Sequence, residues 1–201
     1  KLGDKSKIKK ITFIGNKIFK DNRLKRLIAS SEYKFWKIIS GRKYLNENLV
    51  KLDERLLKNY YLNNGYYDVK IYSSFAKLVK ENEFELIFNI DSNQQYYFGD
   101  IKLDLPPDFD EKNFLKLEKL FSDIKGEVYS INQIDKILDE IDLITLQEQY
   151  QFINASVEEN LVSNNINLIF KIKESDKYYV EKINIYGNNV TQENVIRNQL
   201  E

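Results

Sequence analysis

Cysteine, histidine and methionine are absent from this 201-residue chain, and glycine and proline are scarce, with 7 and 2 residues. Without cysteine or histidine there is no disulfide, no thiolate nucleophile and no general base that titrates near neutral pH, and zinc and haem lose their commonest ligands. Without methionine the chain holds no initiator residue, so we expect an internal fragment or a processed product from which targeting signals have been removed. These absences argue against an enzyme.

Nucleotide-binding loops and membrane-spanning segments are missing as well. No apolar run approaches the roughly 20 residues that a membrane-spanning helix needs. The glycines stand too far apart for a glycine-rich dinucleotide loop or a P-loop. An acidic cluster around Asp135 and Asp139 lacks the loop carbonyls of a calcium site, and a solvated helix face explains it better. We therefore expect no catalytic residue, no cofactor and no metal site.

The charges cancel in number but not in position, since the chain has 31 Lys and Arg against 31 Asp and Glu. Residues 1–51 hold 15 basic and 4 acidic side chains, whereas residues 104–161 hold 5 and 14. The basic end has neither a nucleic-acid-binding motif nor a stacking platform, so we expect no nucleic-acid partner. An acidic protein partner or anionic headgroups fit it at least as well. Its basic residues include Lys5, Lys7, Lys9, Lys10, Lys17, Lys20, Arg23, Lys25 and Arg26.

The chain repeats itself, and a repeat predicts the architecture whatever the function. The segment Ile11–Asn16 (ITFIGN) returns as Ile183–Asn188 (INIYGN), and Tyr97–Leu103 corresponds to Tyr179–Ile185. We therefore expect two complete units and the truncated start of a further one. Their expected bounds are 1–92, 93–175 and 176–201.

The first unit is expected to run strand, helix, helix, strand, strand. An alternating strand at 11–14 ends at Gly15-Asn16, a dipeptide that tolerates the positive φ of a turn. Asp21 is the expected cap of the first helix, a second helix starts near Asn46, and Asn63-Asn64-Gly65 supplies its left-handed end. The expected apolar stripe of the second helix is Leu49, Leu52, Leu56 and Tyr60. In the first closing strand Val69, Ile71, Ser73 and Phe75 share a face. In the second, one side packs inward through the alternating residues Phe84, Leu86, Phe88 and Ile90.

The second unit repeats this order. Pro106-Pro107 ends its first strand, and Ser130 with Gln133 three residues later predicts a capping box at its second helix. Asn164-Asn165 is the expected hairpin turn, and Asn154 is the expected left-handed residue where the first unit has glycine. The helix stripes are Phe114, Leu117, Leu120 and Phe121, then Ile134, Ile137, Leu138 and Ile141.

These patterns predict an α+β fold of tandem β-α-α-β-β units, each a three-stranded mixed sheet with two helices on one face. Two helices cover only one face of so small a sheet, which leaves the other face and at least one edge strand open. Such an architecture favours binding over catalysis.

The residues resemble a known family, the POTRA domains, which are the periplasmic repeats of outer-membrane assembly proteins. The shared features are the order of elements, the glycine-asparagine turn, and the second helix leading through Tyr60-Tyr61 to Gly65-Tyr66. Phe35-Trp36-Lys37 followed by Gly41-Arg42-Lys43-Tyr44 is more specific and is similar to the third POTRA domain of five-domain assembly factors. The second unit then corresponds to the fourth domain, and the segment from Tyr178 to the start of the fifth.

The resemblance implies a non-catalytic periplasmic scaffold in an outer-membrane protein. The implied partners are unfolded outer-membrane proteins, accessory lipoproteins of the assembly machinery, and a membrane barrel domain in the same full-length chain. The expected mechanism is β-augmentation, in which an extended segment adds to an exposed sheet edge. The strand at 68–77 is the expected edge, because hairpin pairing uses only one of its sides and its serines and single lysine do little to block the other. The expected binding residues are Val69, Lys70, Ile71, Tyr72, Ser73, Ser74 and Phe75.

Two alternatives fit the same residues. In the first alternative, the chain is a rigid spacer whose units set the distance between a membrane barrel and accessory proteins. The short connection between the units favours this alternative, because it limits bending. Alternatively, it is the POTRA array of a related transporter, from two-partner secretion or from the translocation and assembly module.

Overall fold

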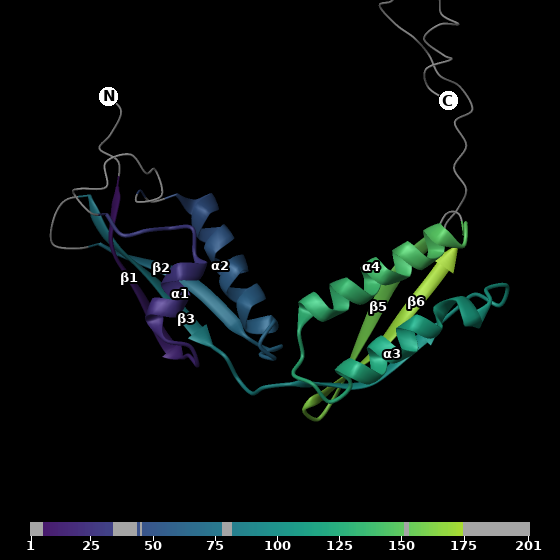
Figure 1. Ribbon diagram of the computed structural model, residues 1–201. Coiled ribbons are helices and arrows are strands. Elements are labelled where there is room, and N and C mark those ends of the chain that lie inside the picture. Colours follow the sequence, from purple (N-terminus) through teal and green to yellow (C-terminus); the bar gives the residue numbers. More distant parts are fainter. Residues whose placement is uncertain (1–5, 34–43, 45, 78–81, 151–152, 175–201) are drawn as a thin grey trace, which may run out of the picture.

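The structure is a computed structural model that describes residues 6–33, 44, 46–77, 82–150 and 153–174. Figure 1 shows two units in succession, each with one sheet and its helices on one face of that sheet. The expected further unit at 176–201 lies outside the described residues, as does the motif from Phe35 to Lys43. Within the described part, no helix is both long enough and apolar enough to cross a lipid bilayer.

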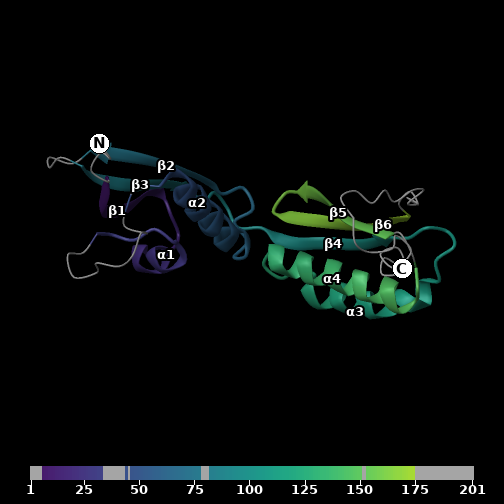
Figure 2. The ribbon, with the colours of Figure 1, turned by 90° about the horizontal axis from the view of Figure 1, so that it is seen from above.

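The first unit is a mixed three-stranded sheet with β3 at its centre. Parallel pairing joins β1 to β3, so that Phe13 lies opposite Phe88, and antiparallel pairing joins β2 to β3. Figure 2 shows both helices on the same side of the sheet. The elements are β1 (Lys7–Asn16), α1 (Asp21–Leu27), α2 (Glu47–Leu62), β2 (Lys70–Lys77) and β3 (Glu83–Asp91).

The second unit repeats this topology, with β6 at the centre, β4 parallel to it and β5 antiparallel to it. A short 3₁₀ turn, η2, precedes its first helix. The α+β fold class and the β-α-α-β-β order predicted from the sequence are therefore confirmed. The elements are β4 (Tyr97–Asp104), η2 (Glu111–Phe114), α3 (Leu115–Ile124), α4 (Ile131–Gln147), β5 (Ile153–Val162) and β6 (Asn165–Glu174).

Each sheet buries one face against its helices, and the central strand supplies most of that face. In β3 the alternating residues Leu86, Phe88 and Ile90 are fully buried, as predicted, and the Phe88 ring stacks on Phe13 with centroids 5.4 Å apart. Burying one such side chain stabilises the fold by about 1.5–3 kcal/mol. The two units thus have separate cores of similar construction.

The buried face of α2 differs from the predicted stripe by one position. The residues that face the core are Val50, Asp53, Leu57 and Tyr61, whereas Leu49, Leu52, Leu56 and Tyr60 are only half-buried. Asp53 is the cause, because its carboxylate accepts hydrogen bonds from the backbone nitrogens of Ala29 at 2.6 Å and Ser30 at 3.2 Å. A buried acid that satisfies two backbone donors turns the helix away from the face that its leucines suggest.

Two glycines, one near the end of β1 and one after α2, adopt the backbone conformation predicted from the sequence. Gly15 and Gly65 have φ of 92° and 86°, so both adopt the left-handed conformation expected of them. The second helix begins next to Asn46, as expected, and Asn46 caps it by accepting a hydrogen bond from the nitrogen of Leu49. These turns need no partner from elsewhere in the chain, which explains why local sequence predicts them.

Four other local predictions are wrong. Asp21 is the first residue of α1, not its cap, and its carboxylate pairs with Lys17. Ser130 forms no capping bond to its own helix. Gln149, not Asn154, takes a left-handed φ near the end of α4. The hairpin turn lies at Ser163-Asn164, one residue before the expected pair, because Ser163 has the positive φ and Asn165 already belongs to β6.

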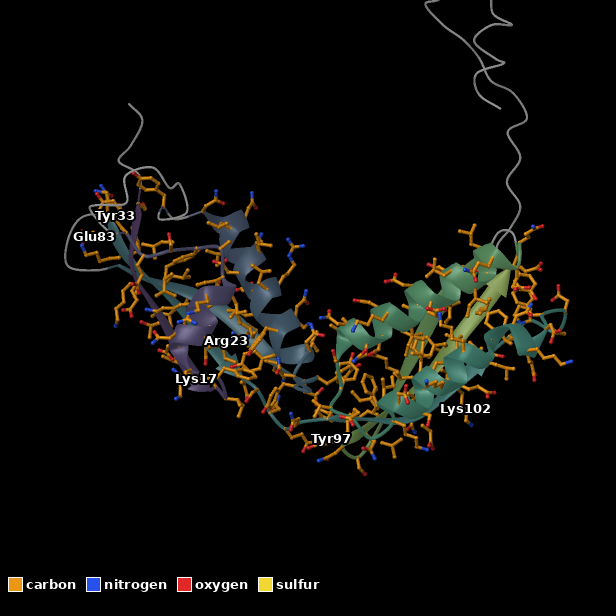
Figure 3. All side chains as sticks on the ribbon, in the orientation of Figure 1. Lys17, Arg23, Tyr33, Glu83, Tyr97 and Lys102 are labelled. Atoms are coloured by element: carbon orange, nitrogen blue, oxygen red, sulfur yellow. The ribbon has the colours of Figure 1, made fainter. Side chains whose placement is uncertain are left out.

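The two units meet at a joint built from the end of α2 and the loop before β2 on one side, and from the start of β4, the start of α4 and β5 on the other. Figure 3 places Tyr97 where the chain passes from the first unit to the second. One residue earlier, the nitrogen of Tyr96 donates to the carbonyl of Gly65 at 2.8 Å. The side chain of Asn63 accepts from the hydroxyl of Ser130 and from the nitrogen of Asn132, both at 2.8 Å.

Candidate protein-binding edge

The strand β2 lies at the end of the first sheet and pairs with β3 on one side only. Neighbouring residues of an antiparallel strand direct their backbone hydrogen-bonding groups to opposite sides. The nitrogen of Ser73 points away from β3, because it donates to the Glu54 carboxylate at 2.9 Å. By alternation, the nitrogens of Ile71 and Phe75 point to the same open side. On this side of β2, the nitrogens of Ile71 and Phe75 face an added strand, whereas the nitrogen of Ser73 between them is occupied by Glu54.

The other end of the same sheet is covered. Along β1, the carbonyl of Ile8 accepts from the nitrogen of Tyr33 at 2.7 Å, and the nitrogen of Ile11 donates to the carboxylate of Glu32. The segment after α1 thus occupies the backbone groups that would otherwise pair with a partner. Of the two edge strands in the described part of this unit, β2 is the open one.

In the described part of the second unit, one edge strand is likewise covered and the other is open. The start of β4 is covered, because the nitrogen of Phe98 donates to the carbonyl of Glu127 and its carbonyl accepts from Gly126, both at 2.9 Å. Among the described residues, nothing bonds to the outer backbone of β5. That strand carries Glu158 and Glu159 at its centre, whereas β2 carries no acid. The two open edges therefore differ in charge.

The residues predicted to bind a partner fall in and just before β2. Lys70 to Phe75 belong to the strand, with the side chains of Lys70, Tyr72, Ser74 and Phe75 exposed. Val69 precedes the strand, its side chain is buried, and its nitrogen donates to the carbonyl of Tyr66. The structure thus brings six of the seven to the edge strand and places Val69 in the core.

A groove of about 730 Å³ runs between β2 and α2. Lys51, Arg55 and Lys58 line it from the helix, and Lys70 lines it from the strand. None of these four cations has an ion-pair partner among the described residues. Among the described residues that line the groove, the one acid is Glu54, whose carboxylate is bonded to Ser73.

The basic residues singled out at the N-terminal end behave differently, because acids of the same unit neutralise several of them. Lys10 pairs with Glu85 at 3.0 Å and Lys25 with Glu32 at 2.6 Å. Lys9 and Lys17 pair with Glu83 and Asp21. Sequence reasoning missed the cations beside the edge strand. The signal was present in the spacing of Lys51, Arg55 and Lys58, which places them on one face of a helix.

A second cluster of polar side chains lies at the joint between the two units. The hydroxyls of Tyr67 and Tyr129 donate to the two oxygens of the Glu159 carboxylate, each at 2.8 Å. Burial, and then the hydrogen bond to Glu159, raise the pKa of Tyr67 to about 12. The same causes raise the pKa of Tyr129 well above its ordinary value. Both phenols are therefore protonated at physiological pH and act as donors. The bond from Tyr67 joins the first unit to the second, and the bond from Tyr129 holds the Glu159 carboxylate in place within the second unit.

The sequence is similar to that of a known protein family and to individual known proteins. Residues 6–93 match the POTRA family, described as a surface antigen variable number repeat. The outer membrane protein assembly factor BamA of Neisseria meningitidis is 27% identical over 98% of this chain and 25% of its own length. BamA of Neorickettsia risticii is 24% identical over 96% of this chain and 26% of its own. The chain spans about a quarter of the length of these relatives.

Solved structures share the fold. The crystal structure of POTRA domains 3 to 5 of Haemophilus influenzae BamA matches with a TM-score of 0.67 and 15% identity, over 96% of this chain and 76% of that one. BamA of Haemophilus ducreyi lacking POTRA domains 1 to 3 matches with a TM-score of 0.61 and 15% identity, over 84% of this chain and 29% of that one. At this level of identity the likeness shows a common architecture.

Proposed function

We propose that this chain, whose residues 6–93 match the POTRA family, binds extended segments of unfolded outer-membrane proteins by β-augmentation on β2. Its likeness in sequence to BamA supports a periplasmic scaffold of an outer-membrane assembly factor as its setting. The membrane barrel domain belongs to the remainder of such a chain. Accessory lipoproteins of the assembly machinery are the second class of partner that we propose.

The observation that carries this proposal is the open side of β2. An added strand gains backbone hydrogen bonds from Ile71 and Phe75, and from Ser73 where it displaces Glu54, with little demand on its own sequence. A factor that handles many different barrel strands needs this kind of recognition, because such strands share a backbone and an alternating pattern but no fixed sequence. The exposed Tyr72, with 63% of its surface accessible, provides an apolar contact on the open face of the sheet.

Amide hydrogen exchange tests the proposal directly. The chain is mixed with a synthetic strand peptide of about 10 residues, the length of a barrel strand. We expect the amides of Ile71 and Phe75 to gain protection, because they acquire acceptors. The amides of Tyr72 and Ser74 already bond to β3, so their protection should not change, and they serve as an internal control. Binding without any new protection at Ile71 and Phe75 would contradict augmentation on this edge.

A proline at Ile71 provides the matching genetic test. The substitution Ile71→Pro removes an outward donor and leaves the donors that point to β3 in place. We expect the peptide affinity to fall while circular dichroism shows a folded chain. A folded Ile71→Pro variant that binds the peptide with unchanged affinity would count strongly against the proposal.

The rigid spacer is a second candidate, and the joint is the observation that favours it. Hydrogen bonds cross the joint at several places, among them Gly65, Asn63 and Glu159. A connection of this kind limits the bending between two domains. Deleting the second unit in the full-length protein separates the two candidates. Retained partner binding with disturbed barrel assembly would favour the spacer.

The positions of the two units within the full array remain a prediction. The proposed order is third and fourth POTRA domain, followed by the start of the fifth. Counting the units that precede Lys1 in the full-length chain tests this order. It also separates a five-domain assembly factor from the POTRA array of two-partner secretion or of the translocation and assembly module, which has fewer units.

A further inference from the structure

The groove between α2 and β2 has an unbalanced charge. Of the described residues that line it, Lys51, Arg55 and Lys58 lie on the helix and Lys70 on the strand, against the single acid Glu54. Within the described residues these cations have no carboxylate partner, although four lysines elsewhere in the same unit do. Exposed cations that gather along one groove raise the local concentration of acidic ligands.

Glu54 shows what kind of group this groove accepts. Its carboxylate reaches across from α2 and accepts a hydrogen bond from the nitrogen of Ser73 at 2.9 Å. In an added strand, a backbone carbonyl would accept from that nitrogen. Glu54 therefore occupies, from within the chain, the place of one acceptor of the partner strand.

The spacing of the cations suits an extended partner. Arg55 follows Lys51 by four positions and Lys58 follows Arg55 by three. These spacings correspond to about 6 and 4.5 Å along a helix. Side chains on one face of a strand recur every second residue, about 6.8 Å apart. The long side chains of lysine and arginine accommodate the small mismatch.

We infer that the groove selects extended segments that carry carboxylate side chains at alternate positions, and that such a segment adds to β2 with its acidic face toward α2. This inference rests on the proposed function, since it requires augmentation on β2, and it adds the chemical class of the partner. On binding, a backbone carbonyl of the segment replaces the Glu54 carboxylate at Ser73. The acidic side chains then pair with Lys51, Arg55 and Lys58.

Three matched peptides test the inference. They share one apolar face and carry glutamate, glutamine or lysine at every second position of the other face. At low ionic strength, where exposed charges are least screened, we expect the glutamate peptide to bind the chain about tenfold more tightly than the glutamine peptide, and the lysine peptide to bind most weakly. The preference should shrink as salt is added.

Two double variants assign the preference to the groove. Lys51→Glu with Arg55→Glu should abolish or reverse the order of the glutamate and lysine peptides. Lys102→Glu with Lys119→Glu makes the same change in net charge on exposed positions of the second unit, and Figure 3 places Lys102 there. This control should keep the original order. Equal effects of the two double variants would overturn the inference, because net charge alone would then explain the preference.

The substitution Glu54→Gln tests the role of the carboxylate that is bonded to the nitrogen of Ser73. The glutamine retains an acceptor for Ser73 but removes the negative charge from the groove. We expect the glutamate peptide to bind several-fold more tightly to this variant and the glutamine peptide to bind about as before. An unchanged ratio of the two affinities would contradict the role of charge in the groove.

The outcomes separate the inference from the proposed function. Equal affinities for the glutamate and glutamine peptides, with new amide protection at Ile71 and Phe75, would overturn the inference and leave augmentation standing. Absence of binding and of protection with all three peptides would overturn both. A tighter glutamate complex with protection at both amides would support both.

Discussion

The side-chain oxygen of Asn63 lies 2.8 Å from the backbone nitrogen of Asn132, so the residue that ends α2 in the first unit caps α4 in the second. The same oxygen accepts from the hydroxyl of Ser130. A helix cap is ordinarily supplied by the residue next to the helix. Here it comes from another unit, which makes the start of α4 sensitive to how the two units sit together.

Replacing Asn63 by alanine tests this shared cap. We expect Asn63→Ala to lower the free energy of unfolding of the second unit by about 1 kcal/mol, the usual cost of a lost cap. Urea unfolding followed separately in each unit measures the effect. Asn46→Ala removes the cap of α2 within the first unit and serves as the control. A loss confined to the first unit in both variants would show that Asn63 does not act across the joint.

Glu159 joins two tyrosines from different units through one carboxylate. We expect Glu159→Gln to weaken the joint by about 1–2 kcal/mol, because an amide oxygen accepts more weakly than a carboxylate and its nitrogen cannot accept at all. Distances between spin labels on the two units should broaden in this variant. Glu158→Gln alters an exposed pair with Lys171 and should leave the distances unchanged. Broadening of similar size in both variants would contradict a specific role of Glu159.

Alkaline pH should loosen the joint. The pKa of Tyr67 is raised from its ordinary 10.0 to about 12, so the folded joint favours the protonated phenol. Its contribution to stability is complete below pH 10, decreases as the pH rises from 10 to 12, and is lost above 12. Tyrosinate absorbance and the spin-label distances should change together in this range. In Glu159→Gln the titration should move to lower pH, and an unmoved titration would exclude Glu159 as a cause.

Two left-handed glycines differ in their surroundings and offer a matched pair. A Cβ atom on Gly65 would lie 2.6 Å from a methyl group of Val128 and 3.0 Å from the carbonyl oxygen of Tyr96, whereas a Cβ on Gly126 would meet nothing within 4 Å. Both have positive φ, so either alanine substitution costs about 1–2 kcal/mol of backbone strain. We expect Gly65→Ala to cost more and to alter the spin-label distances. Equal costs in thermal unfolding would argue against close packing at the joint.

Asp53 is fully buried, and its carboxylate satisfies the nitrogens of Ala29 and Ser30. Asp53→Ala leaves these donors without acceptors, so we expect a loss of about 2–3 kcal/mol in the unfolding free energy of the first unit. Asp21→Ala removes an acid whose pair with Lys17 is partly exposed, and it should cost under about 1 kcal/mol. Similar costs in urea unfolding would contradict the role assigned to Asp53.

The sequence predicts those parts of the fold that depend on neighbouring residues. Alternation places Leu86, Phe88 and Ile90 on the buried face, and the positive φ of Gly15 and Gly65 follows from residue type alone. Because the chain repeats, the order of elements predicted for the first unit also holds for the second. The open edge follows from the same patterns, because a final hairpin leaves its first strand with a single partner.

The errors arise where a distant residue decides the local structure. Ser130 and Gln133 have the spacing of a capping box, but Asn63 supplies the acceptor instead. The leucines of α2 suggest the wrong face, because the backbone of Ala29 and Ser30 draws Asp53 into the core. For the candidate site, residue types identify β2 but not its charged groove, which exists only once α2 lies beside the strand.

The parallel pairing of first and last strands governs how each unit reaches its native state. Lys7 pairs with Glu83 and Tyr97 with Asn165, so neither sheet is complete until the final strand of its unit is available. Closing so long a loop costs entropy before any contact repays it. A chain that emerges from its N-terminus therefore carries β1 unpaired until β3 arrives. The pairing of β1 with β3, and of β4 with β6, is therefore among the last contacts that each unit can complete as the chain is synthesised.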